Sequence, residues 1–251
     1  MTHDEVHRNS PNRGTLIVIP AFNESESLPG VIDEIRMHVP HADVLVVDDG
    51  STDGTSDVAR ALGVQTITMP FNVGVGGATR AGLLFGRRQG YAAVVQCDAD
   101  GQHPPESVDE LVKGLDAADM VIGARFTGLG EYEARGPRLW SMRFLAWAFS
   151  RIHNTELTDV TSGFRSFGPR GIEVLSTQMP REYLGDTVEA LVIAKENGLV
   201  VRQTPVAMRP RRGGTASHGP LKATVFLIRA TLMLALSLVR LAQRRPPQPA
   251  R

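Results

Sequence analysis

Short apolar runs alternate with segments of helical spacing over residues 15–124, and this alternation restricts the possible folds more than any other feature. Each apolar run has the length of a buried strand. Strands are therefore expected at residues 15–19, 44–47, 64–69, 91–97 and 120–124. Helices are expected between them at 28–39, 58–62, 77–88 and 105–115. The pattern predicts an α/β fold, with a mainly parallel sheet covered by helices on both faces.

The second half of the chain has a weaker pattern. Its expected elements are two helices and a strand, at residues 140–152, 187–195 and 199–208. We expect four regions: a polar tail at residues 1–13, a main domain at 14–218, an amphipathic helix at 219–243 and a basic proline-rich tail at 244–251. Because the first region is polar and has no apolar run, no signal peptide is expected.

The composition is that of a globular protein. With 42% hydrophobic and 22% charged residues, the chain can bury a core and is neither disordered nor fibrous. Cys97 is the single cysteine, which excludes an internal disulfide and fits a reducing compartment. We interpret Cys97 as a small buried apolar residue.

Charge is distributed unevenly, although the formal net charge is zero. From Leu199 onward there are ten Lys/Arg and no Asp/Glu. Residues 221–241 are apolar apart from Lys222, Arg229 and Arg240, which share one helical face at about 100° per residue. This pattern favours a helix docked on an anionic membrane surface, with packing on protein or on a second copy as the alternative. We expect a cytoplasmic protein, peripheral on the inner face of the membrane, with no nucleic-acid partner.

An acidic triplet follows the fourth expected strand. Asp98 and Asp100 stand one residue apart where the chain leaves a buried run. Ligands of parallel sheets bind at the carboxyl ends of the strands. Paired carboxylates there are suited to Mg²⁺ or Mn²⁺, which usually also binds substrate phosphates. The sequence therefore predicts a divalent cation at this edge of the sheet.

A second acidic turn follows the second expected strand. Asp53 has two interpretations of equal weight, a helix cap or a site residue. Capping does not account for Asp48 and Asp49, which precede the turn. Their carboxylates are suited to accept hydrogen bonds from a nucleobase or a ribose.

A glycine-rich turn, residues 72–78, precedes the third expected helix. Gly74 and Gly76 either admit a diphosphate to the backbone or form a tight turn. A dinucleotide-dependent oxidoreductase is a further alternative, because Asp98 lies 24 residues beyond Gly74 at a strand end. That alternative is weaker, since its glycines would follow the first strand and not the third.

Several motifs in fixed order resemble the dolichol-phosphate mannose synthase group of family 2 glycosyltransferases. The motifs are Ile19-Pro20-Ala21-Phe22-Asn23-Glu24, Val47-Asp48-Asp49-Gly50-Ser51, Asn72-x-Gly74-x-Gly76-Gly77-Ala78, Asp98-Ala99-Asp100-x-Gln102-His103-Pro104, Gly123-Ala124-Arg125 and Thr161-Ser162-Gly163-Phe164-Arg165. The resemblance covers residues 15–217 and implies a GT-A fold for the main domain. It also implies an inverting, metal-dependent transfer of a sugar from a GDP- or UDP-linked donor to a polyprenyl phosphate.

The resemblance assigns a role to individual residues. The donor nucleotide would be lined by Pro20, Ala21, Asn23, Glu24, Asp48, Asp49, Gly76 and Asp98. Asp98, Asp100 and Gln102 would hold the cation. The acceptor phosphate would contact Arg125, Arg138, Ser141 and Arg212, and the residues closest to the chemistry would be Asp100, Arg125 and Arg212. The sequence departs from the family at His218, where the family usually has a lysine after Ser217.

The acceptor decides whether the reaction needs a general base. A phosphate monoester, with a second pKa near ~6, is already anionic at neutral pH. A hydroxyl acceptor must lose a proton, which makes Asp186 and Glu189 the candidate bases in that alternative. The competing interpretation of this pair is a helix cap and a first-turn acid, which we favour for Asp186.

Overall fold

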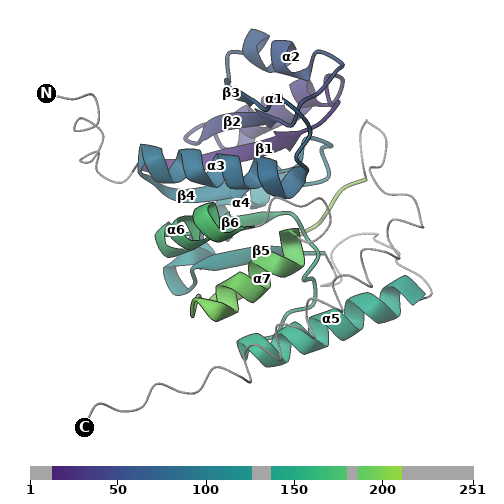
Figure 1. Cartoon of the computed structure of the whole chain (residues 1–251), viewed down its shortest axis with the longest axis vertical. Helices are drawn as coiled ribbons and strands as arrows, with labels where there is room; N and C mark the ends of the chain where they lie inside the picture. Colours follow the sequence, from purple (N-terminus) through teal and green to yellow (C-terminus); the bar gives the residue numbers. More distant parts are fainter. Residues whose placement is uncertain (1–12, 126–136, 180–185, 211–251) are drawn as a thin grey trace, which may run out of the picture.

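The computed structural model describes residues 13–125, 137–179 and 186–210. Seven strands form one sheet: β1 (Arg13–Ala21), β2 (Asp43–Asp48), β3 (Gln65–Thr68), β4 (Tyr91–Gln96), β5 (Met120–Ala124), β6 (Arg165–Phe167) and β7 (Val201–Pro205). The helices are α1 (Leu28–His38), α2 (Thr55–Ala61), α3 (Val75–Gln89), α4 (Val108–Lys113), α5 (Pro137–His153), α6 (Pro169–Gln178) and α7 (Asp186–Glu196), together with the 3₁₀ turns η1 (Pro105–Ser107) and η2 (Gly114–Ala117). The expected α/β alternation is confirmed, and Figure 1 shows the sheet crossed by helices.

The strand order is β3-β2-β1-β4-β6-β5-β7. Every pairing is parallel except those of β6, which runs antiparallel to both β4 and β5. Neither β6 nor the following α6 was expected from the sequence. The strand has only three residues, and its buried Arg165 and Ser166 conceal the apolar signature of a central strand.

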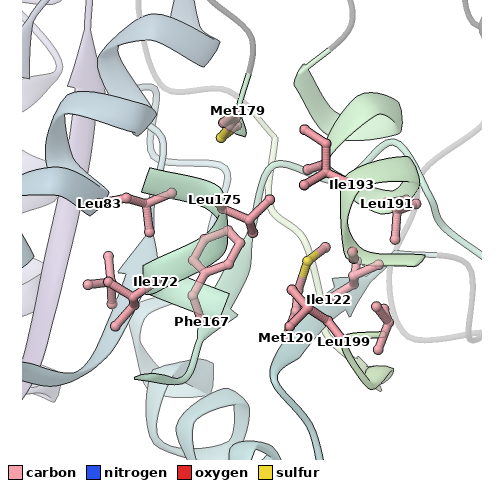
Figure 2. Close-up of a cluster of buried hydrophobic side chains, with 14 of the residues drawn as sticks. Leu83, Met120, Ile122, Phe167, Ile172, Leu175, Met179, Leu191, Ile193 and Leu199 are labelled. Atoms are coloured by element: carbon pink, nitrogen blue, oxygen red, sulfur yellow. The ribbon is translucent and has the colours of Figure 1, made fainter. Parts of the chain in front are cut away.

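Helices cover both faces of the sheet, as expected. One apolar cluster joins alternate β1 residues such as Leu16 and Val18 to α3, α5, α6 and α7. The other joins Ile17 and Ile19 to α1, α2 and α4. In Figure 1, α3, α6 and α7 lie on the near face, and Figure 2 shows the first cluster where Phe167 of β6 packs among residues of α6 and β5. Because side chains alternate along a strand, one set of β1 side chains enters each cluster, and both faces of β1 are buried.

One expected helix is interrupted. Residues 105–115 were expected to form a single helix, but only Val108–Lys113 is α-helical, flanked by the 3₁₀ turns η1 and η2. At the second break, Gly114 packs so closely on β5 that an added Cβ would lie 3.0 Å from Val121 Cγ2. The close approach of the chain to the sheet accounts for the change of helix type at this end.

The expected amphipathic helix at 219–243, the tails at 1–13 and 244–251, and the turn holding Arg212 and His218 lie outside the described residues, except for Arg13. Over the three described segments, no helix combines the length and apolar character needed to cross a membrane.

Candidate active site

The loops after β1 and β2 are fastened to each other at the carboxyl edge of the sheet. Asn23 adopts a left-handed backbone conformation with φ 55°. Its side-chain oxygen accepts the Thr52 N–H at 2.9 Å, and its own N–H donates to Ser51 Oγ at 2.9 Å. The Glu24 N–H donates to Thr55 Oγ1 at 3.0 Å. Asn23 and Glu24 therefore lie beside the acidic turn, in line with the expected grouping.

Asp48 and Asp53 shape the acidic turn itself. Asp48 is buried, and its carboxylate accepts hydrogen bonds from the Ser51 N–H and the Ser56 hydroxyl. Asp53 accepts the N–H of Thr55 at the start of α2 and the N–H of Ser25, both at 3.0 Å. Asp53 therefore satisfies the first N–H of α2, although the N-cap residue itself is Gly54, and it also ties the β1 loop to α2. A role for Asp48 at the nucleotide stays a prediction.

Asp49 holds the glycine-rich turn. Its two carboxylate oxygens accept the N–H groups of Val73 at 2.7 Å and Gly74 at 2.8 Å. Burial raises the pKa of Asp49, an effect only partly offset by these two N–H donors. Gly50 has φ +73°, and its backbone lies so close to that of Phe71 that an added Cβ would be 2.7 Å from the Phe71 carbonyl carbon. The tight-turn interpretation is supported by these contacts, and contact with a diphosphate stays a prediction.

The predicted cation ligands come directly after β4. Asp100 is buried, whereas the Asp98 side chain is 35% exposed. The Asp98 N–H donates to His103 Nδ1 at 2.9 Å, and His103 Nε2 lies 3.5 Å from Asp98 Oδ2. His103 stacks on Phe164 with ring centroids 4.8 Å apart. His103, to which the sequence assigned no role, therefore orients the first carboxylate.

The donor atoms here fit a hard divalent cation. Asp100 Oδ1 accepts the Gln102 N–H at 3.0 Å, which closes the turn. The Gln102 side-chain nitrogen faces the Arg209 carbonyl oxygen at 3.5 Å, so its amide oxygen points away from that carbonyl. Within the described segments, no group of three His, Cys, Asp or Glu side chains is gathered as a metal site. Asp98, Asp100 and Gln102 would hold the cation through two carboxylates and an amide oxygen, a donor set of the kind that Mg²⁺ takes alongside substrate phosphates.

Arg125, expected at the acceptor phosphate, is bound to Asp159. Its Nε and one terminal nitrogen donate to the two oxygens of Asp159 at 2.6 and 3.0 Å, and the same terminal nitrogen donates to Thr161 Oγ1 at 2.8 Å. The Asp159 side chain is fully buried. Burial by itself would raise the pKa of Asp159, but the Arg125 guanidinium outweighs it and holds this pKa below its usual range. Asp159 was not predicted, because no motif spacing links it to Arg125.

The turn before β6 lies against the cation ligands. A Cβ added to Gly163 would be 3.2 Å from Asp98 Oδ2. Buried Arg165 donates to the carbonyls of Val160 and Ser162 in this turn and of Thr187 in α7. The start of α7 is thereby tied to the site.

Several expected site residues have undescribed side chains. Glu189 lies on α7 and is half-buried. The side chains of Arg138, Ser141 and Asp186 are not described, and Arg212 lies outside the described residues. The expected pair of candidate bases is therefore only partly located.

A mainly parallel sheet with a carboxylate pair closing a central strand defines a GT-A-type sugar transferase fold. The chain belongs to glycosyl transferase family 2, whose family model matches residues 16–172. It is therefore a glycosyltransferase, and the oxidoreductase alternative is set aside.

The chain is also similar to two relatives and to one solved structure. Undecaprenyl-phosphate mannosyltransferase of Micrococcus luteus is 39% identical over 161 residues, which is 61% of this chain and 65% of that protein, just under two thirds. Polyprenol monophosphomannose synthase of Mycolicibacterium smegmatis is 33% identical over 221 residues, covering 82% of this chain and 81% of that protein. Glucosyl-3-phosphoglycerate synthase of Mycobacterium tuberculosis, solved with Mn²⁺, UDP and glucosyl-3-phosphoglycerate, superposes with a TM-score of 0.65 at 25% identity, covering 90% of this chain and 79% of that one.

Proposed function

We propose that this chain transfers a sugar from a GDP- or UDP-linked donor to a polyprenyl phosphate, with inversion and with Mg²⁺ or Mn²⁺. The observation that carries the proposal is the carboxylate pair Asp98 and Asp100, which closes β4 at the carboxyl edge of the sheet. Support for the acceptor comes from the two relatives, whose names specify mannosyl transfer to undecaprenyl phosphate and polyprenol monophosphomannose synthesis.

The donor would lie along the carboxyl ends of β1, β2 and β4. Pro20, Ala21, Asn23 and Glu24 would line the nucleotide together with the acidic turn and the glycine-rich turn at Gly76. Asp49 would act here by holding that turn through the Val73 and Gly74 N–H groups. Asp98, Asp100 and Gln102 would hold the cation, which supplies neutralisation of the charge that develops on the leaving diphosphate.

The acceptor phosphate would be aligned by Arg125, Arg138, Ser141 and Arg212. Because a phosphate monoester is already anionic at neutral pH, alignment replaces proton abstraction as the main requirement. Arg125 would serve as a rigid part of this set, since Asp159 fixes the orientation of its guanidinium. Attack from behind the anomeric carbon would invert its configuration.

The lipid acceptor implies that the protein works at a membrane surface. We propose peripheral attachment at the cytoplasmic face through the basic, apolar segment 219–243, whose residues combine an apolar face with Lys222, Arg229 and Arg240. Deletion of this segment is expected to abolish vesicle binding. Sugar transfer to a water-soluble short-chain acceptor should be retained.

The test of the reaction uses purified protein, polyprenyl phosphate and a panel of nucleotide sugars. A glycosylated lipid phosphate that requires Mg²⁺ or Mn²⁺, disappears with EDTA and is lost in Asp100→Ala would support the proposal and identify the donor. Metal-dependent transfer to a hydroxyl compound instead would overturn the acceptor assignment and favour Glu189 or Asp186 as base. Retention of the donor anomeric configuration, read by NMR of the product, would overturn inversion.

A further inference from the structure

Arg209, just after β7, connects the predicted cation loop to two other parts of the molecule. Its N–H donates to the Gln102 carbonyl at 3.0 Å, and its own carbonyl faces the Gln102 side-chain nitrogen at 3.5 Å. Its guanidinium donates to Glu34 of α1 at 2.9 Å and to both oxygens of Glu106 in η1 at 2.6 and 2.7 Å. A single side chain therefore ties the cation loop to α1 and to η1.

The charges around Arg209 are mostly negative. Glu34 and Glu106 form ion pairs with it, and Asp98 and Asp100 lie in the loop whose Gln102 contacts Arg209. Burial acts to raise the pKa of Glu106, but a hydrogen bond from its own backbone N–H, together with hydrogen bonds and charge from Arg209, outweighs burial and lowers this pKa. Arg209 therefore supplies a positive charge to both glutamates.

The contacts also explain how Arg209 acts on Gln102. Between Arg209 and Gln102 there are two hydrogen bonds that do not use the arginine side chain, one main-chain bond of 3.0 Å and one from the Gln102 amide of 3.5 Å. One terminal nitrogen of Arg209 donates to both oxygens of Glu106 and the other donates to Glu34, so the side chain also anchors this residue. Both anchors come from elements that do not themselves carry predicted cation ligands.

We propose that Arg209 is a positioning residue for the divalent-cation site. It fixes Gln102 against its main chain, while its guanidinium anchors it to Glu34 and Glu106. This inference rests on the cation site of the proposed function, but it does not depend on the sugar or the acceptor. Mutation of a residue that orients a metal ligand in this way typically lowers metal affinity by about 10- to 100-fold.

The experiment measures Mn²⁺ binding, by the electron paramagnetic resonance signal of free Mn²⁺, with UDP and with GDP in parallel. Arg209→Met is expected to weaken Mn²⁺ binding by about tenfold. The matched control is Arg202→Met, which removes an exposed arginine of β7 that bonds only the Ala117 carbonyl among the contacts described for it. Its Mn²⁺ affinity should stay at the wild-type value.

Two further variants separate positioning from a general loss of stability. Arg209→Lys keeps the charge but lacks the fork that reaches both glutamates, so an intermediate affinity is expected. In Arg209→Met/Glu106→Gln, the losses should be less than additive, because both changes break the same contact. Should Arg209→Met fail to fold, the Arg209→Lys and Glu106→Gln affinities still decide the question.

Wild-type Mn²⁺ affinity in Arg209→Met or Arg209→Lys, even with a lowered melting temperature, would overturn the inference. A different outcome is that the parent protein binds Mn²⁺ and the Arg209 variants show the expected losses, but the transfer assay yields no lipid product. That outcome would reject the acceptor proposal and leave the role of Arg209 intact. Absence of Mn²⁺ binding by the parent protein with either nucleotide would reject the cation site and this inference together.

Discussion

Buried charges near the site are each matched by a specific partner. Arg125 and Asp159 form a two-pronged pair in which the carboxylate side chain is 0% exposed. The Arg60–Asp57 pair of α2 has a similar separation but side chains that are 55% and 85% exposed. Solvent screens the exposed pair, whereas breaking the buried pair leaves a charge without water or a counterion. The two pairs should therefore differ widely in their effect on stability.

Replacing Asp159 by Asn tests this difference. The amide would place a donor against the Arg125 guanidinium and lower the free energy of unfolding by about 3 kcal/mol. Urea unfolding at neutral pH measures the loss, with Asp57→Asn as the control, for which a change below about 1 kcal/mol is expected. Equal losses in the two variants would contradict the importance of burial.

Asp53 makes the stability of the protein depend on pH in the acidic range. Burial acts to raise its pKa, but hydrogen bonds from Thr55 and Ser25 outweigh this and lower the pKa from 3.8 to about 2. Because the folded-state pKa is depressed, the stabilisation is present above pH 3.8 and is lost as the pH falls toward 2.

The variant Asp53→Asn should therefore be less stable than the parent protein at pH 6, and the difference should shrink as the pH approaches 2. Asp53 is exposed, so a loss of about 1 kcal/mol or less is expected at pH 6, as for other helix caps. Urea midpoints measured across this pH range provide the test. A difference that is constant with pH would show that the charge of Asp53 has no part in it.

At the scale of elements, α3 lies unusually close to the sheet. A Cβ added to Gly82 would be 2.3 Å from Val18 Cγ1 of β1, and one added to Gly86 would be 2.6 Å from Val94 Cγ2 of β4. The glycines thus let the helix backbone approach the two central strands. This packing fixes α3, and with it the glycine-rich turn that begins the helix.

Two glycine-to-alanine variants should have opposite effects. Gly82→Ala forces a methyl group into β1 and should cost about 1–3 kcal/mol, as for other overpacked cores. Gly30→Ala in α1 meets nothing within 4 Å and should gain about 0.5–1 kcal/mol from helix propensity. Thermal unfolding of both variants is the measurement. A stabilised Gly82→Ala would mean that α3 shifts easily on the sheet.

At the scale of the whole molecule, the candidate site is built from distant parts of the chain. Residues after β1, β2, β4 and β7 meet at the carboxyl edge, and contacts such as Asn23–Thr52 and Gln102–Arg209 fasten neighbouring loops. A ligand that binds several of these loops stabilises the folded state without affecting the unfolded one. Binding should therefore be visible as a rise in melting temperature.

Mn²⁺ with UDP or GDP, at about 100 times its dissociation constant, should stabilise the protein by about 2.7 kcal/mol. For a domain of this size, that corresponds to a rise in melting temperature of roughly 5–10 °C. EDTA should abolish the metal-dependent part, and Asp100→Ala should lose it while Asp57→Ala retains it. An undiminished shift in Asp100→Ala would remove that residue from the cation site.

Sequence patterns located much of the fold and the position of the predicted cation ligands at the end of their strand. Residues 120–124 were expected as a strand and are β5, and the capping role of Asp53 was one of the two interpretations. The acidic triplet at Asp98 and Asp100 also follows its strand as expected. These features depend on local patterns, because periodicity and turn chemistry report which face of a nearby element is buried.

Only the tertiary structure decided where β6 inserts and which charged groups pair. Arg125 and Asp159 are 34 residues apart, and Glu106 and Arg209 are 103 apart. Many acidic and basic residues in this chain are chemically able to pair, so residue type alone does not select the partners. The selection comes from strand order and from the burial that removes water, and neither is encoded in any short stretch of the sequence.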